Sequence, residues 1–348
     1  MENVLYIHDV LELEQKLTEL TKGKKVFYLT EETVYLHVIK EDLKHLLNGP
    51  MLIVSPGEKN KNLQATEQIC QFLLNNRADR HSVLVSIGGG VITDLGGFAA
   101  SIYQRGIESI YIPTSLLGMC DAAIGGKTGV NFKHFKNQIG TFAFAESVLI
   151  LPSLLETLPL KEFKSGVAEM LKHLLICNKQ AFESFILPEK LSELTVESIK
   201  QAVLIKQEIV KSDFKESENR KKLNLGHTFG HALESYFLKY LPDEVPHGYA
   251  IAAGIIMESF CNLKLNHLNK KAFQQICQKI YPYFPHLSFP VTTIPEISDF
   301  MTSDKKNRKD NNYICLLSDI GSAQPEVLID NNLIAEALRF YSNKNYQN

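Results

Sequence analysis

The sequence predicts an α/β domain followed by an all-helical domain. Short runs rich in Val and Ile alternate with helical stretches over roughly the first 150 residues, whereas the rest of the chain has helical spacing and little strand character. A length of 348 residues is enough for about two domains. We therefore expect an α/β domain over residues 1–150 and an all-helical domain over residues 151–348.

The first half contains five runs with the character of buried strands. They are short, β-branched and end in turn residues, and they cover residues 25–29, 51–55, 82–90, 109–115 and 147–152. Strands that alternate with helices are typical of a parallel sheet.

The second half contains four long stretches with apolar residues at helical spacing. They cover residues 160–176, 196–213, 224–241 and 248–265. A cleft between the two domains is the place where a binding site is most often found.

Composition excludes several classes of function. The net charge of −2 gives no basic field for nucleic acid, and no apolar run approaches the ~20 residues that span a membrane. The start, MENVLYIHDV, lacks the pattern of a secretion signal. Six cysteines without a CxxC spacing indicate reduced thiols, and hence a cytoplasmic protein.

Two stretches of the first half are candidates for binding a nucleotide. The Gly88–Gly90 turn lies between a strand and a helix, where backbone N–H groups can approach a phosphate; it is otherwise only a tight turn. Asp94, one turn into that helix, is either a partner of the helix dipole or a cofactor contact. The turn PGEKNK, residues 56–61, either holds a ribose or phosphate or is a solvated loop.

A glycine-rich stretch over residues 121–140 is expected to be a functional loop, because a helix would not tolerate its glycine density. Cationic side chains on such a loop suit a phosphate or a carboxylate. The polar residues that it carries are Asp121, Lys127, Lys133, Lys136 and Asn137.

The second half contains a candidate metal site. Arg220, Asn224, His227 and His231 fall on one stripe of a predicted helix, and His247 begins the next helix. Glu169 and Lys172 share a helix face, either as an ion pair or with Glu169 as a metal ligand. Imidazoles with one carboxylate are typical ligands of a catalytic zinc. The spacing alone leaves open whether His227 and His231 both hold the metal.

These residues belong to a series of linked motifs that resembles the 3-dehydroquinate synthase family. From Gly57 to Lys306, in order, the chain has GGGVxxDxxGF, RG, PTSLL, DxxIGGKTGVN, KNxIG, GxAExxK, LNxGHTxGHAxE and HG. The resemblance implies a Rossmann-like NAD-binding domain and a metal- and substrate-binding domain. It also implies the family's reaction in the shikimate pathway, from 3-deoxy-D-arabino-heptulosonate 7-phosphate to 3-dehydroquinate and phosphate. In that reaction NAD oxidises a hydroxyl transiently, phosphate leaves, the ketone is reduced again, and an aldol step closes the ring.

The resemblance also implies roles for individual residues. Zinc or cobalt would be held by Glu169, His227 and His247, while His231 faces the substrate. Lys206 and Arg220 would hold the substrate carboxylate, and Asp121 and Lys172 would lie at the reacting hydroxyls. The substrate phosphate would be bound by Lys127, Asn137, Asn224, His231 and Lys305. NAD would be bound by Glu58, Lys61, Gly89, Gly90, Val91, Asp94, Thr114, Ser115, Lys127, Lys136 and Thr157.

A homodimer is also implied, since Arg105 resembles an arginine that reaches the neighbouring subunit's site. The chain departs from the family pattern at Ala122–Ala123, in place of two serines, and at Glu31–Thr33, in place of Asp-x-Asn at the adenosine ribose.

Three alternatives to this function differ in what they need. A sister cyclase acting on a neutral sugar phosphate would need no residues that bind a substrate carboxylate, such as Lys206 and Arg220. A metal- and NAD-dependent polyol dehydrogenase would need no phosphate-binding set. A non-catalytic nucleotide-binding module would require a lost metal ligand, and all three ligands are present.

Overall fold

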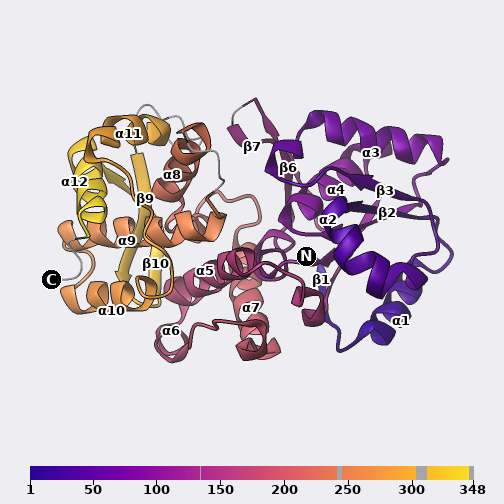
Figure 1. Ribbon diagram of the computed structural model, residues 1–348, viewed down its shortest axis with the longest axis horizontal. Helices are drawn as coiled ribbons and strands as arrows, with labels where there is room; N and C mark the ends of the chain where they lie inside the picture. Colours follow the sequence, from indigo (N-terminus) through magenta and orange to yellow (C-terminus); the bar gives the residue numbers. More distant parts are fainter. Residues whose placement is uncertain (134, 241–244, 303–311, 345–348) are drawn as a thin grey trace. The chain divides into compact units, whose positions relative to one another are not determined.

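The computed structural model describes residues 1–133, 135–240, 245–302 and 312–344, which form two compact units (Figure 1). The first unit comprises Met1–Phe163 with Lys190–Val203, and the second comprises Lys164–Glu189 with Leu204–Asn348. This division differs from the predicted one at residue 150. Helices α5 (Leu160–Cys177) and α7 (Val196–Ser212) each begin in the first unit and end in the second, so no change of sequence pattern marks the boundary.

The first unit contains a six-stranded, fully parallel sheet in the order β1-β8-β5-β4-β2-β3, which confirms the predicted parallel sheet. Strand β4 is buried at all six of its positions and forms the centre. Five of the six strands of this sheet were predicted, and the edge strand β1 was not. The strands are β1 (Asn3–Tyr6), β2 (Val26–Glu31), β3 (Met51–Val54), β4 (Val83–Gly88), β5 (Glu108–Pro113) and β8 (Ser147–Ile150).

The order of strands reverses beside β2, because β3 lies on one side of it and β4 on the other. Ligands of parallel sheets bind at the carboxyl ends of the strands at such a reversal. Glu31 ends β2 there and Gly88 ends β4. The fold therefore places the predicted nucleotide site at the edge of the sheet where a nucleotide is expected.

Helices cover this sheet, and α4 is the most deeply buried of those described in the first unit. It packs closely because Gly96 faces β4, where an added Cβ would lie 2.0 Å from Ser86 Oγ. The helical segments of this unit are α1 (Val10–Thr21), α2 (Glu32–Val34), η1 (Tyr35–Leu43), η2 (Lys44–Leu46), η3 (Glu58–Asn60), α3 (Leu63–Asn75), α4 (Gly90–Ile102), η4 (Tyr103–Arg105), η5 (Gly118–Ala122), η6 (Pro152–Leu155) and η7 (Leu191–Glu193).

The prediction of a loop over residues 121–140 was wrong for most of that stretch. Strands β6 (Lys127–Phe132) and β7 (Phe135–Phe142) form an antiparallel hairpin there. Gly129 pairs with Gly140, and an added Cβ on Gly140 would lie 2.2 Å from the carbonyl oxygen of Thr128. The glycines allow close approach of two strands, a use that glycine content alone does not distinguish from a loop.

The second unit is mainly helical, as predicted, and adds a β-hairpin that was not predicted. Helix α9 is buried along nearly its whole length and is packed against α8, α10, α12 and strand β9 (Figure 1). The elements that begin in this unit are α6 (Lys179–Ser184), η8 (Asn219–Asn224), α8 (His227–Tyr240), α9 (His247–Lys264), α10 (Lys270–Ile280), η9 (Val291–Thr293), α11 (Ile294–Thr302), β9 (Asn312–Asp319), β10 (Ser322–Ile329) and α12 (Asn331–Ser342).

Two glycines on α9 bring the helices of the second unit unusually close. An added Cβ on Gly248 would lie 2.3 Å from Ser165 Cα of α5, and one on Gly254 would lie 1.9 Å from the carbonyl oxygen of Gly226, just before α8. Gly248 therefore lets the start of α9 approach α5, and Gly254 lets the middle of α9 approach the start of α8. Among the described residues, no helix combines the length and apolar character that crossing a membrane requires.

Candidate active site

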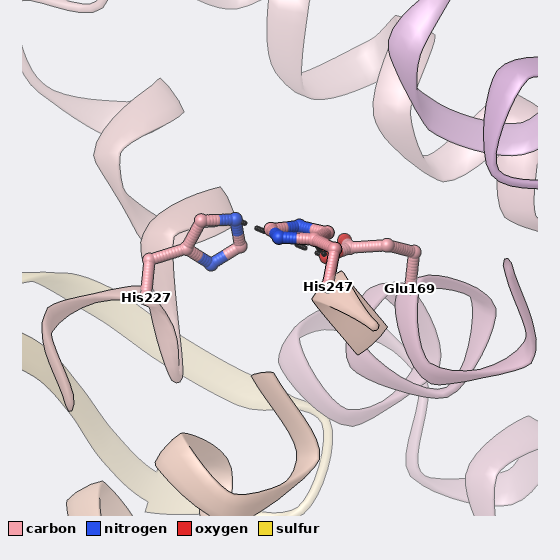
Figure 2. A group of neighbouring side chains, drawn as sticks. All are labelled: Glu169, His227 and His247. Atoms are coloured by element: carbon pink, nitrogen blue, oxygen red, sulfur yellow. Dashed lines mark ion pairs between the residues drawn. The ribbon is translucent and has the colours of Figure 1, made fainter. Parts of the chain in front are cut away.

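The second unit brings one carboxylate and two imidazoles together (Figure 2). Glu169 lies on α5 and is fully buried, while His227 and His247 are the first residues of α8 and α9. Glu169 Oε1 lies 3.4 Å from His247 Nε2 and 3.8 Å from His227 Nε2. One ligand atom from each residue lies within 4.8 Å of the other two. This donor set, two nitrogens and one oxygen, fits a divalent metal such as zinc.

Each of these imidazoles has an acceptor at its other ring nitrogen. His227 Nδ1 lies 3.2 Å from the carbonyl oxygen of Leu225, and His247 Nδ1 lies 3.2 Å from Glu234 Oε1. Both acceptors favour a proton on Nδ1, so Nε2 is the ring atom that faces Glu169 and could bind a metal. Metal-binding histidines are commonly oriented in this way by a carbonyl or carboxylate.

The electrostatics of the cluster also suit a cation. Burial alone would lower the pKa of His247, but the carboxylates Glu234 and Glu169 outweigh burial and raise it to about 10. Glu169 also forms an ion pair with Lys172, one of the two alternatives that their spacing left open. A fully buried carboxylate requires positive charge beside it, and Lys172 supplies that charge.

His231 lies near the same cluster. Its ring centroid is 5.1 Å from that of His227 and 6.1 Å from that of His247. It joins Glu234 and His247 in a second group of donors within 4.8 Å, whereas His227 joins Glu169 and His247 in the first. Its assignment to the substrate rather than to the metal stays a prediction.

Glu234 belongs to a motif of the sequence but was given no role there. It is largely buried, on the same face of α8 as His227, two helical turns further on. Its spacing of seven residues from His227 is the sequence feature that could have identified Glu234 as a neighbour of that histidine.

The predicted helical stripe from Arg220 to His231 was wrong, because the helix is interrupted. Arg220 and Asn224 lie on the 3₁₀ segment η8, and α8 begins only after Gly226, whose φ of +81° a helix cannot adopt. Arg220 is 1% exposed, and its Nη1 donates to the carbonyl oxygen of Phe214 at 2.6 Å.

Glu216, which no sequence pattern indicated, lies beside Asn224. The amide of Asn224 donates to Glu216 Oε1 at 2.9 Å. Glu216 has a left-handed backbone, with φ of +58°, in the segment between α7 and η8. A lone glutamate in a charged stretch offers no pattern that would single it out.

In the first unit, the Gly88–Gly90 turn has the features of a phosphate cradle. Gly89 is the N-cap of α4, and no side chain caps this helix. The N–H of Thr114 donates to the carbonyl oxygen of Gly88 at 3.0 Å, and an added Cβ on Gly89 would lie 3.3 Å from Ser115 Oγ. The predicted residues Gly89, Gly90, Thr114 and Ser115 are therefore neighbours at a helix N-terminus, which favours an anion.

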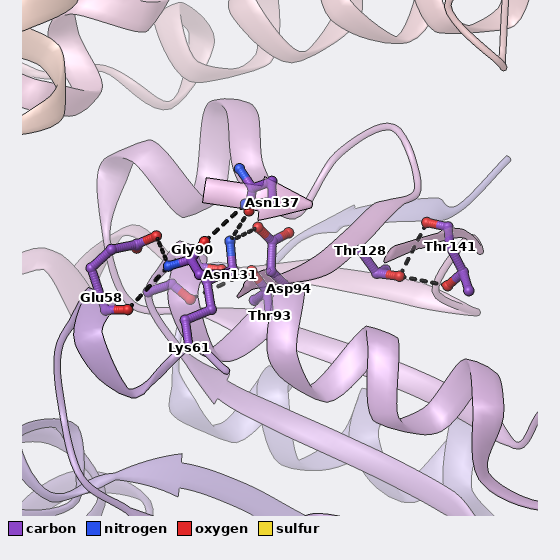
Figure 3. A network of polar contacts seen from close by, with 10 residues as sticks. Glu58, Lys61, Gly90, Thr93, Asp94, Thr128, Asn131, Asn137 and Thr141 are labelled. Carbon is purple, nitrogen blue, oxygen red and sulfur yellow. Dashed lines mark hydrogen bonds and ion pairs between the residues drawn. The ribbon is translucent and has the colours of Figure 1, made fainter. Parts of the chain in front are cut away.

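A polar network links further predicted residues (Figure 3). Buried Lys61 donates to Asp94 Oδ2 at 2.5 Å and to Asn137 Oδ1 at 2.7 Å, so Asp94 is an ion-pair partner of Lys61. Asn131, which was not predicted, joins the network: its amide donates to Glu58 Oε1 at 2.8 Å, and its Oδ1 accepts the Asn137 N–H at 2.8 Å. This network ties η3, α4 and the β6–β7 hairpin together.

The remaining predicted residues are distributed over both units. Lys206 is buried on α7, and Arg105 is exposed, with φ of +72°, at the end of η4. Lys305 lies outside the described residues. The others are Val91 in the first turn of α4, Asp121 on η5, the exposed Lys127 and Lys136 on the β6–β7 hairpin, and the exposed Thr157 after η6.

Comparisons with known proteins agree with the motif pattern. The chain matches the family models described as 3-dehydroquinate synthase N-terminal over residues 51–165 and 3-dehydroquinate synthase C-terminal over residues 166–307. It is 39% identical over 338 residues to a protein named 3-dehydroquinate synthase from Parabacteroides distasonis, covering 95% of this chain and 94% of that protein.

Solved structures share the fold. The 2-epi-5-epi-valiolone synthase of Streptomyces hygroscopicus, with NAD+ and Zn2+ bound, has a TM-score of 0.84 and 24% identity, covering 99% of this chain and 97% of its own. A 2-deoxy-scyllo-inosose synthase in complex with carbaglucose-6-phosphate, NAD+ and Co2+ has a TM-score of 0.83 and 24% identity, covering 97% and 96%.

Proposed function

We infer that this chain, which belongs to the 3-dehydroquinate synthase family, converts 3-deoxy-D-arabino-heptulosonate 7-phosphate to 3-dehydroquinate and phosphate. The observation that carries this proposal is the family match over residues 51–307 together with the buried cluster that this stretch contains. The reaction releases phosphate without water as a reactant, so the chain is a phosphate-eliminating lyase of the shikimate pathway, which leads to chorismate and the aromatic amino acids.

The cofactors are NAD and one divalent metal, Zn2+ or Co2+. When bound, NAD takes up and returns a hydride, and the metal polarises the hydroxyl that is oxidised. We propose that Glu169, His227 and His247 hold the metal, with Glu234 and the carbonyl of Leu225 orienting the two imidazoles. The Gly88–Gly90 turn at the start of α4 would receive the pyrophosphate of NAD.

The substrate carries a carboxylate and a phosphate, and the chain offers cationic and amide groups for both. Buried Arg220 and Lys206 are proposed to bind the carboxylate, since a guanidinium matches its geometry. Lys172, paired with Glu169, is proposed to lie at a reacting hydroxyl, together with Asp121. The phosphate would be bound by Lys127, Asn137, Asn224, His231 and Lys305.

The remaining NAD contacts rest on the network in the first unit. Lys61 and Asp94 are held by the hydrogen bond between them, and Glu58 is held by Asn131, so these side chains are ordered without a nucleotide. Preordered groups lose less conformational entropy on binding. Val91, Lys136 and Thr157 complete the proposed set.

Assembly and location are further parts of the proposal. A homodimer is proposed because Arg105, which is exposed, resembles an arginine that reaches the neighbouring subunit's site in the family. Light scattering would report about twice the mass of the 39.3 kDa chain. A cytoplasmic location is proposed because the six cysteines are free thiols and the reaction is a biosynthetic one.

A single incubation tests the reaction type. The purified protein is mixed with NAD+, Zn2+ and 3-deoxy-D-arabino-heptulosonate 7-phosphate, and phosphate, NADH and 3-dehydroquinate are followed together. We expect equal amounts of phosphate and 3-dehydroquinate with no net NADH, because the hydride is returned in each turnover. NADH accumulating in step with substrate consumption, without phosphate, would instead indicate a polyol dehydrogenase.

A further inference from the structure

The segment between α7 and η8, residues 213–218, is folded around the carboxylate of Asp213. Its Oδ1 accepts the N–H and the hydroxyl of Ser217 at 2.9 and 2.8 Å. Its Oδ2 accepts the N–H of Glu218 at 2.7 Å and that of Arg220 at 3.1 Å. One side chain therefore receives three backbone donors and a hydroxyl, and it joins the irregular segment to the start of η8.

These bonds favour the ionised form of Asp213. Burial alone would raise its pKa, but the backbone N–H groups of Glu218, Ser217 and Arg220 and the Ser217 hydroxyl outweigh it, so the pKa is held well below its usual value. A carboxylate that accepts several N–H groups is a strong constraint on the backbone, because charged acceptors form the stronger hydrogen bonds. The segment is therefore held in place around a fixed negative charge.

The segment presents two of the proposed substrate residues. Arg220 Nη1 donates to the carbonyl oxygen of Phe214 at 2.6 Å, so the segment's backbone directs the guanidinium. Asn224 donates to Glu216 Oε1 at 2.9 Å, and Glu216 has the strained φ of +58° that the segment imposes. Both contacts use atoms whose positions depend on the turn that Asp213 closes.

We propose that Asp213 is a positioning residue for anion recognition: it orders residues 213–218 so that Arg220 and Asn224 are directed at the charged groups of the substrate. This inference rests on the proposed function, since that function supplies the anionic substrate. Asp213 acts through Arg220 and Asn224 and does not itself contact the substrate. Its loss should weaken substrate binding rather than metal or NAD binding.

The test compares Asp213→Asn with Glu218→Gln. Glu218 lies on the same segment and is exposed, so its substitution removes one negative charge while leaving the four hydrogen bonds of Asp213 in place. We expect Asp213→Asn to raise KM for the substrate about tenfold or more, with a smaller change in kcat. Metal content and the Kd for NAD+ should match those of the native protein, and Glu218→Gln should behave as the native protein throughout.

A double-mutant cycle separates positioning from general destabilisation. In an Arg220→Lys background, Asp213→Asn should have much less effect on KM, because the group that it positions is already altered. Independent, additive effects of the two substitutions, or equal KM for Asp213→Asn and Glu218→Gln, would overturn the proposal. If Asp213→Asn does not fold, Ser217→Ala removes only the hydroxyl donor and should raise KM about two- to threefold; an unchanged KM would count against the proposal.

Failure of the proposed function gives a different result. It would appear as an absence of phosphate release by the native protein and by Glu218→Gln alike. If the positioning role fails, the native protein, Glu218→Gln and Asp213→Asn should all release phosphate with the same KM.

Discussion

At the scale of single residues, the two histidines of α8 have different surroundings although they are one helical turn apart. The ring of His227 has a carbonyl at Nδ1 and Glu169 near Nε2. His231 has its ring beside both other imidazoles but is grouped with Glu234 rather than with Glu169. Spacing alone treats the two histidines alike, and the difference arises from the helices packed around them.

Metal content distinguishes their roles. His247→Ala should lose the metal and all activity, because it removes one of three proposed protein ligands. His231→Ala should keep the metal and lose turnover only. Bound metal is measured by elemental analysis after dialysis against metal-free buffer; a metal-free His231→Ala together with a metal-loaded His247→Ala would reverse the assignment.

A second prediction at this scale concerns Glu234, whose carboxylate accepts a hydrogen bond from His247. Glu234→Gln leaves an acceptor near His247 Nδ1 but removes the charge that orients the imidazole. We expect zinc affinity to fall about 10- to 100-fold, as is usual when such a partner is changed. Competition with a chelator of known affinity measures this; an unchanged Kd for zinc would show that Glu234 has no part in the site.

Residue identities that belong to linked motifs could be predicted from the sequence, and Glu169, His227 and His247 lie together as that prediction requires. Asn131 and Glu216 could not be predicted in this way. Their importance arises from hydrogen bonds to Glu58 and Asn224, which neither spacing nor composition encodes.

At the scale of elements, the cluster of Glu169, His227 and His247 depends on how closely α9 approaches α5. Gly248 follows His247 directly, and an added Cβ there would meet the Ser165 backbone, at 2.3 Å from Cα and 2.5 Å from the carbonyl oxygen. A backbone obstacle cannot rotate away, so a side chain at this position must move the helix. The glycine therefore determines the distance between His247 and Glu169.

Gly248→Ala should accordingly weaken metal binding at least tenfold while leaving a folded protein destabilised by about 1–3 kcal/mol, the usual range for overpacking. Ala253→Gly is the matched control, because it removes one methyl from the same buried helix at a position about 140° around the helix axis from Gly248. Urea unfolding and zinc titration of both variants check this. Equal zinc affinity in the two variants would contradict it.

Elements were predicted best where the period of apolar residues is long and uninterrupted. The central strands and α9 meet this condition. The β6–β7 hairpin and the break before α8 do not meet it and were not predicted. Glycine allows close pairing of two strands in the hairpin, and it adopts a left-handed backbone conformation in the break before α8. In both cases the glycine's role depends on a neighbour distant in the sequence.

At the scale of the whole molecule, stability should depend on Glu31 at the end of β2. Burial raises its pKa above the usual 4.5, the Gly57 N–H lowers it in part, and Glu162 raises it further. A raised pKa means that the folded chain holds the proton more tightly than the unfolded chain. The contribution to stability is therefore present below the usual value and is lost as pH rises through the raised value.

Glu31→Gln mimics the protonated form and should raise the urea midpoint of the NAD-free protein at pH 8. The difference from the native protein should shrink as the pH falls towards 4.5. Glu32→Gln, at the exposed neighbouring position, is the control and should change the midpoint little at either pH. A difference that grows towards acid pH would show that the carboxylate of Glu31 is stabilised in the fold.

The division of the chain shows the limit of sequence patterns at this scale. The change from α/β to helical character was visible near residue 150, but the units divide within α5 and α7. A continuous helix has one periodicity along its length, so its sequence does not report which unit each end joins. The order of the sheet strands likewise depends on long-range pairing.

The most direct test of the account is the choice of substrate. Phosphate release by the purified protein, with NAD+ and Zn2+, is measured from 3-deoxy-D-arabino-heptulosonate 7-phosphate, sedoheptulose 7-phosphate and glucose 6-phosphate in parallel. We predict release from the first alone, because Arg220 and Lys206 are proposed to bind its carboxylate. Release only from a neutral sugar phosphate would contradict the assigned reaction and make the chain a cyclase of another substrate.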